Sequence, residues 1–192
     1  MQRPVWFESL FGSVETASFQ KNRSLFEFDD EAKVLKSKGN GHQFYVGVFE
    51  TPSNSELTAR ISEMIQEPSQ ISFKNVTGDV RTLHQQNQGA VFQVASQFNC
   101  LEMVGPGVSP ERGITIYSQD PTQGPACALS CPAATVFRNY FVNGKGQAGK
   151  RQIDLIADVG TIVDNKANKY WVMQNGYCLP CDPKTMSKLG ER

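Results

Sequence analysis

The sequence predicts an α/β fold of three layers, in which helices cover both faces of a mixed central sheet. Residues 43–49 and 90–95 are apolar runs rich in β-branched and aromatic side chains, which is typical of strands. Residues 56–66 carry apolar side chains at helical spacing. The run 90–95 is apolar on both faces apart from Gln93, as expected of a central parallel strand covered by helices.

The composition limits the classes of function. The chain has 192 residues, with 19 basic and 19 acidic side chains, so its formal net charge is zero. This balance argues against non-specific nucleic-acid binding, because no basic excess can release counterions. No run reaches the length of about 18 apolar residues that a membrane span needs. With five scattered cysteines and no export signal at the N-terminus, we expect reduced thiols in a cytoplasmic protein.

Three parts are expected along the chain. Residues 1–68 form an N-terminal extension of a short helix, strands and a helix, packed on an α/β core at 69–182. Residues 183–192 form a polar tail. The first helix, within 1–18, has one aromatic face, for which we favour docking onto the domain over partner binding.

The remaining elements follow from local patterns. Short strands are expected over 24–28, 32–37 and 43–49, then a helix over 56–66 and a strand over 71–76. The next strand is 90–95, which implies a tight crossover.

A long loop spans 104–125, with a short strand at 114–117. A helix over 127–140 must be kinked at Pro132 or begin there. Residues 151–159 fit either a helix or a strand. A last strand is expected at 169–173, followed by a turn at 175–177.

Two segments in this order resemble the opening of a macrodomain. Residues 73–80 read FKNVTGDV, a strand ending in Gly-Asp-Val, and residues 90–99 read AVFQVASQFN, an apolar strand ending in an Asn-bearing loop. A glycine follows at the start of a helix, in the Thr-Gln-Gly-Pro-Ala sequence of 122–126. The resemblance covers roughly 71–140. It departs from the family in the long loop between Asn99 and Gly124.

The resemblance implies a site for ADP-ribose or an ADP-ribosylated substrate, with no cofactor and no metal. Asp79 would bind the adenine amino group and Asn99 the distal ribose, while the glycine loop would offer backbone amides to phosphate. The residues expected to contact the ligand are Asp79, Val80, Ser96, Gln97, Asn99, Gln123, Gly124, Pro125, Ala126 and Cys127.

Hydrolysis of an ADP-ribosyl glycosidic or ester bond is the activity that the resemblance implies for an enzyme. Such chemistry needs a group that activates water near the ribose. Asp120 is the preferred candidate and Glu102 the second, with Asn99 holding the ribose.

Other interpretations stay open. The chain fits a non-enzymatic protein-interaction domain with a degenerate nucleotide pocket. A zinc site from the pairs Cys127/Cys131 and Cys178/Cys181 is another option, although the CxxxC spacing is poor for zinc. A thiol hydrolase would pair Cys100 with a histidine such as His84.

Overall fold

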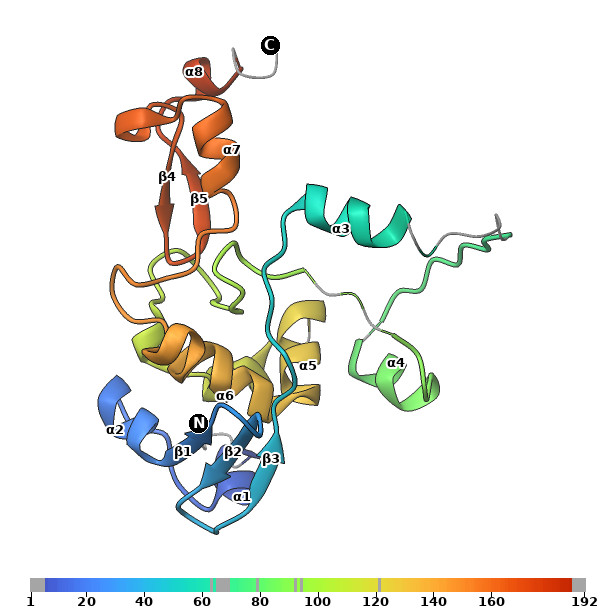
Figure 1. Ribbon diagram of the computed structural model, residues 1–192, viewed down its shortest axis with the longest axis vertical. Coiled ribbons are helices and arrows are strands. Elements are labelled where there is room, and N and C mark those ends of the chain that lie inside the picture. The colour runs from blue at the N-terminus through green and yellow to red at the C-terminus, as the bar shows by residue number, and fades with distance from the viewer. Residues whose placement is uncertain are drawn as a thin grey trace.

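The computed structural model describes residues 6–62, 64, 70–78, 80–91, 93, 95–120 and 122–187. It contains both helices and strands, which confirms the mixed α/β content. Figure 1 shows a lower lobe around three strands, a column that rises from it to the C-terminal hairpin, and an arm at one side. Among the described residues, no helix is both long and apolar enough to cross a membrane.

The first sheet is an antiparallel meander of β1 (Phe26–Asp29), β2 (Val34–Ser37) and β3 (Gln43–Tyr45). Its register places Phe26 opposite Ser37 and Leu35 opposite Phe44. All three strands were predicted, and the third is shorter than the predicted range. Hairpins of this kind follow from local alternation and turn residues, so sequence reading finds them readily.

The N-terminal aromatic residues pack against this sheet. Helix α1 (Trp6–Phe11) buries Phe7 and Phe11, and the Phe11 ring lies 5.0 Å from the ring of Phe26. Docking onto the domain is therefore confirmed for these rings. Of the predicted range 1–18, the described part from 6 to 18 contains this short helix alone. Its neighbour α2 (Phe19–Ser24) begins where the Ser18 hydroxyl accepts a bond from the Lys21 amide.

Two consecutive helices form the centre of the lower lobe. Helix α5 (Gln123–Ser130) and helix α6 (Pro132–Tyr140) replace the single predicted helix. Pro132 occupies the first turn of α6, where its missing N–H costs nothing. The buried side chains of α6 join one core with those of the N-terminal region, including Phe7, Phe26 and Tyr140.

A buried carboxylate ties the N-terminal segment to this core. Glu15 accepts hydrogen bonds from the Ile114 amide at 3.0 Å, from the Thr115 amide at 2.8 Å and from the Tyr140 hydroxyl at 2.5 Å. These bonds fix the start of the 3₁₀ helix η2 (Thr115–Gln119), which follows η1 (Pro110–Arg112). Burial and the adjacent Glu15 together raise the pKa of Tyr140.

The C-terminal part is a small module on the column. It contains α7 (Ala157–Ile162), η4 (Lys166–Asn168), the antiparallel pair β4 (Trp171–Gln174) and β5 (Tyr177–Pro180), and α8 (Pro183–Ser187), and it follows η3 (Val142–Gly144). The predicted turn is confirmed at Asn175-Gly176, whose φ angles of 48° and 82° suit a two-residue hairpin turn.

The arm carries α3 (Asn54–Ser62) and α4 (Val80–Gln86) on extended connections (Figure 1). The predicted strands at 71–76 and 90–95 are wrong for the described residues, which form no ladder there, and 114–117 lies in a 3₁₀ helix. Both sheets in the described chain are antiparallel. Phe73 is 92% exposed and Val91 97% exposed, so these side chains lack the packing that stabilises a strand.

Candidate functional site

Three loop segments, the first turn of α5 and strand β5 line an open cavity of about 350 Å³. We call it the carboxylate pocket. It is lined by Ala95, Ser96, Gln97, Glu102, Met103, Val104, Asp120, Thr122, Gly124, Pro125 and Tyr177. The structure thus brings together six residues that the sequence singled out from two distant stretches, at 96–102 and 120–125.

Glu102 is the most buried acid of the pocket, with a relative exposure of 4%. Its backbone amide donates to the Tyr117 hydroxyl at 3.0 Å, and its neighbours Leu101 and Met103 are buried in the core. Its Oε1 atom is buried with no hydrogen-bond partner among the described residues. A buried carboxylate oxygen without a donor is costly, so such an atom points to a missing partner.

The surroundings of Glu102 favour its neutral form. Burial raises the pKa of Glu102 to about 7, which the positive charge of Arg138 opposes and the negative charge of Asp120 reinforces. Near neutral pH the carboxyl is therefore divided between acid and base forms. A group with this pKa can both give and take a proton at physiological pH.

Asp120 provides a second carboxylate in a different setting. It ends η2, is half-buried, and its Oδ1 accepts the Thr122 amide at 2.9 Å. Thr122 is the N-cap residue of α5. The pocket thus contains one nearly fully buried carboxyl group and one half-buried carboxyl group that is hydrogen-bonded at a helix start.

The start of α5 is closed by Glu102. A β-carbon on Gly124 would collide with the Glu102 carboxyl group and would lie 2.9 Å from the Ala95 carbonyl oxygen. Gly124, Pro125 and Ala126 are all buried. The glycine expected to cradle phosphate therefore makes room for a carboxyl group of this chain.

Asn99 lies outside the lining of the carboxylate pocket. It is fully buried, its Oδ1 accepts the Leu101 amide at 3.0 Å, and its Nδ2 donates to Gln152 Oε1 at 3.0 Å. A β-carbon on Gly176 would lie 2.5 Å from the Asn99 amide. These contacts join the 96–103 loop to the turn between β4 and β5. Asn99 therefore has a structural role.

The other predicted contact residues are placed as follows. Ser96 is exposed and bonds to the Gln97 carbonyl, whereas the Gln97 Oε1 atom is buried without a partner among the described residues. Cys127 is half-buried, and burial raises its pKa, to which Cys131 and Glu102 contribute. Asp79 lies outside the described residues.

Two further predicted residues begin helices: Val80 is the first residue of α4 and Gln123 the first of α5.

Sequence reasoning missed two tyrosines. The Tyr177 ring lines the pocket, and its hydroxyl donates to the Met103 carbonyl at 2.5 Å. Tyr117 is fully buried and holds the Glu102 backbone, and burial raises its pKa. Neither shows a sequence signal of its own, because each is placed by a tertiary contact, Tyr117 with Glu102 and Tyr177 with Met103.

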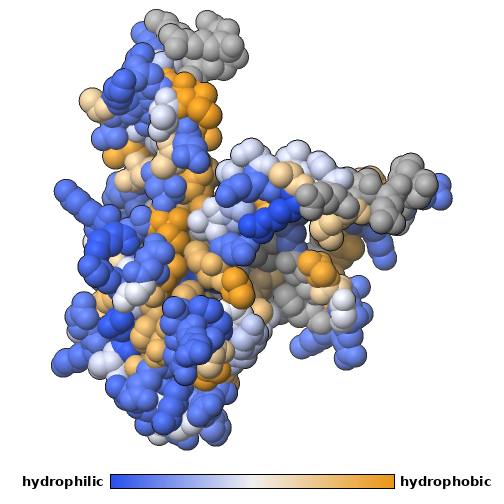
Figure 2. Space-filling model, viewed as in Figure 1, coloured by the Kyte–Doolittle hydropathy of each residue, from blue (hydrophilic) through white to orange (hydrophobic). Residues whose placement is uncertain are grey.

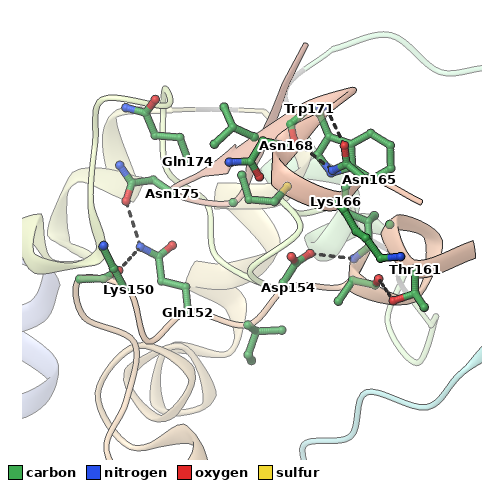
Figure 3. A pocket seen from close by; sticks show the side chains of 18 of the residues that line it. Lys150, Gln152, Asp154, Thr161, Asn165, Lys166, Asn168, Trp171, Gln174 and Asn175 are labelled. Atoms are coloured by element: carbon green, nitrogen blue, oxygen red, sulfur yellow. Dashed lines mark hydrogen bonds between the residues drawn. The ribbon is translucent and has the colours of Figure 1, made fainter. Parts of the chain in front are cut away.

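A larger cavity of about 910 Å³ lies in the C-terminal module (Figure 3). We call it the hairpin cavity. Its amide side chains mostly satisfy one another or the backbone: Gln152 donates to Asn175 at 3.0 Å, and Asn165 donates to the Trp171 carbonyl at 3.0 Å. The sequence offered no motif for this cavity. Among the described residues that line it, none has a buried polar side-chain atom without a partner, unlike Glu102, so it is the weaker candidate for chemistry.

The cysteines show no catalytic or metal-binding arrangement in the part of the chain that is described. None of the five cysteines forms a disulfide bond, and no group of three or more His, Cys, Asp or Glu is placed to hold a metal ion there. Burial raises the pKa values of Cys100 and Cys178, which disfavours the thiolate that a nucleophile or ligand requires. Arg138, near Cys100, donates to its carbonyl at 3.0 Å.

Comparison of the chain with protein-family models, with curated proteins and with solved structures gave no match.

Proposed function

We propose that the protein binds ADP-ribose or a related nucleotide with its ribosyl end in the carboxylate pocket, and that it hydrolyses the bond at that ribose. One observation carries the proposal. Glu102, nearly fully buried and with one unpartnered carboxyl oxygen among the described residues, lines a cavity that it shares with Asp120. The choice of ADP-ribose as the ligand comes from the resemblance of residues 73–80 and 90–99 to a macrodomain.

Two carboxyl groups in unlike settings suit hydrolysis at an anomeric carbon. Glu102, with a pKa of about 7, can protonate the leaving atom, and Asp120 can take a proton from the attacking water. Each such proton transfer contributes roughly 10²- to 10⁴-fold to a rate. Asp120 was the catalytic residue preferred from the sequence. The proposal instead gives both carboxyl groups a role, with Glu102 as the acid and Asp120 as the base.

The cavity size fits the ribosyl end of the ligand. Small-molecule pockets usually measure roughly 300–1,000 Å³, and the carboxylate pocket, at about 350 Å³, lies at the lower end. The adenine contact at Asp79 stays a prediction, whereas the phosphate contact expected at Gly124 is opposed by the Glu102 carboxyl group that lies against this glycine. The finer fold that the resemblance implies, three layers around a mixed sheet, is not part of the proposal, because both sheets of the described residues are antiparallel.

Calorimetry and thermal unfolding test binding. We expect ADP-ribose to release heat and to raise the unfolding temperature, since a ligand present at 100 times its Kd stabilises the native state by about 2.7 kcal/mol. Glu102→Gln should weaken binding and abolish hydrolysis. Glu31→Gln, on an exposed side chain remote from the pocket, is the matched control. Absence of heat and of any thermal shift at millimolar ADP-ribose would refute the proposal.

The arm favours a second candidate function, a protein-interaction domain. Met64 is 77% exposed and Ile71 71% exposed, and Phe73 and Val91 are more exposed still. Apolar residues are visible on the arm in Figure 2. An interaction that survives Glu102→Gln and is lost on Phe73→Ser would support this function, and one with the opposite dependence would contradict it.

A further inference from the structure

The charges around the hairpin cavity, which measures about 910 Å³, balance one another. Its charged lining residues are Lys150, Lys166, Asp154 and Asp164, and all four are exposed. Lys166 pairs with Asp164 at 2.9 Å, and Asp154 accepts the Ile156 amide at 3.0 Å. Because neither sign of charge is in excess, the cavity has no general attraction for an anion or a cation.

Asn168 presents an amide group in this cavity that the protein itself does not use. The residue lines the cavity and is exposed, and its side chain forms no hydrogen bond with the described residues. In the view of Figure 3 its amide lies toward the centre of the group of side chains, and no dashed line reaches it. Gln152 differs, because it donates to Asn175 at 3.0 Å. Asn168 thus has N–H donors and a carbonyl acceptor available to a ligand.

The backbone that carries Asn168 is strained. Asp164, Ala167 and Asn168 all have positive φ angles, of 57°, 53° and 57°. Asp and Asn tolerate this left-handed region, whereas alanine rarely adopts it. The Asn165 side chain holds the segment against β4, since its Nδ2 donates to the Trp171 carbonyl at 3.0 Å. Strain that the surrounding structure maintains is typical of ligand sites, so it indicates a binding role for the segment 164–168.

We propose that the hairpin cavity binds a neutral carbohydrate of about the size of a disaccharide, with the Asn168 amide as a main contact. The site is separate from the carboxylate pocket, and the proposal does not depend on the function proposed for that pocket. A sugar hydroxyl has one donor and two lone pairs, so two neighbouring hydroxyls can pair with the N–H and the C=O of one amide. The volume lies within the range of roughly 300–1,000 Å³ that is usual for small-molecule sites.

The mixed lining of the cavity favours a sugar over other ligands. Val172, which is 37% exposed, and the half-buried Met173 add apolar surface that the C–H face of a sugar ring can cover. A purely apolar ligand would cover the Asn168 amide without giving it a hydrogen bond, which is costly. A phosphate would find Lys166 already paired with Asp164. A neutral ligand with many hydroxyls avoids both costs.

The two tryptophans of the chain allow binding to be located. Trp171 lines the cavity, whereas the Trp6 indole N–H donates to the Thr115 carbonyl in the lower lobe at 3.2 Å. In NMR titrations of the full chain with maltose, cellobiose and lactose, we expect at least one sugar to shift the Trp171 indole signal to saturation and to leave the Trp6 signal in place. Glucose 6-phosphate should bind about tenfold or more weakly. No saturable Trp171 shift with any of the three, or tighter binding of glucose 6-phosphate, would overturn the proposal.

Variants at Asn168 test the contact. Asn168→Gly and Asn168→Asp should each weaken the disaccharide by about tenfold or more, because one removes the amide and the other removes its donors. Asn143→Gly is the matched control, since Asn143 is exposed, has a φ of 54° and lies outside the cavity. Its effect on the unfolding temperature should resemble that of Asn168→Gly, and its binding should be unchanged. Unchanged binding in both Asn168 variants, or an equal loss in Asn143→Gly, would overturn the proposal.

Discussion

Glu102 shows how one residue acquires chemistry from its surroundings. In the sequence it is one of two loop carboxylates, and nothing local distinguishes it from a solvated charge. In the structure Leu101 and Met103 anchor its backbone in the core, and the missing side chain of Gly124 leaves room for its carboxyl group. Burial then disfavours the charged form, because the interior solvates an ion less well than water.

The raised pKa of Glu102 predicts a pH-dependent stability. The folded protein holds this proton up to about pH 7, whereas the unfolded chain releases it near 4.5, so the contribution to the free energy of unfolding is complete below 4.5 and is lost as the pH rises to 7. We expect a loss of about 1–3 kcal/mol between pH 4.5 and 8. In urea titrations across this range, Glu102→Gln should show a smaller loss. Equal slopes for both proteins would contradict the prediction.

Gly124 predicts a second effect at the residue scale. Gly124→Ala should destabilise the protein by about 1–3 kcal/mol and abolish ligand binding, because the new methyl group displaces the Glu102 carboxyl and crowds the Ala95 carbonyl. Gly107→Ala is the control, since no described atom lies within 4 Å of its β-carbon position. Urea unfolding and calorimetry measure both effects. Similar losses for both variants would show that the Glu102 contact is unimportant.

At the scale of elements, the β4–β5 hairpin is attached to the loop that carries the site. The Phe98 amide donates to the Gly176 carbonyl at 2.9 Å, and the Asn99 side chain packs against Gly176. Asn99 also bonds to Gln152. The hairpin turn thus orients the loop from which Gln97 and Glu102 enter the pocket, and β5 adds Tyr177.

The Gly176 contact predicts a measurable difference between two glycines. Gly176→Ala combines backbone strain at a φ of 82° with a collision at Asn99, whereas Gly41→Ala, at a φ of 76°, has only the strain. We expect Gly176→Ala to cost about 1–3 kcal/mol more in the free energy of unfolding, as overpacking does. Urea titration of both variants measures this difference. Equal losses in the free energy of unfolding would show that the contact between Asn99 and Gly176 does not stabilise the protein.

At the scale of the whole molecule, the N-terminal region and the site share one core. Phe7, Phe11, Leu101 and Tyr117 belong to the same buried cluster, and Glu15 bonds across it to the start of η2. The arm with α3 and α4 contrasts with this core, because its apolar side chains stay in water (Figure 2). Stability should therefore depend on the first aromatic residues far more than on the arm.

Two phenylalanines test this division. Phe11 is fully buried, so Phe11→Ala should cost about 3–5 kcal/mol through lost burial and a cavity. Phe73 is 92% exposed, and Phe73→Ala should change the free energy of unfolding by less than about 0.5 kcal/mol. Chemical denaturation of the isolated protein compares them. A large loss for Phe73→Ala would mean that the arm is packed in solution.

The sequence by itself determined the elements whose signals are local. The strands of β1 to β3 and the turn at 175–177 follow from alternation and turn chemistry within a few residues. Pro132 predicted either a kink or a helix start, and the structure shows the start. The same local rules failed at 71–76 and 90–95, because a strand needs a partner and packing, and pattern alone supplies neither. Asp120 was a candidate because it precedes the glycine loop, and Glu102 because it follows Asn99 closely.

Only the tertiary structure decided which of the predicted site residues lines a pocket and which has a structural role. It placed Asn99 in a structural joint, closed the start of α5 with Glu102, and added Tyr117 and Tyr177 from distant segments. Burial and electrostatic field depend on residues far apart in the chain, so one carboxyl among many acquires a pKa near 7 only when the chain has folded.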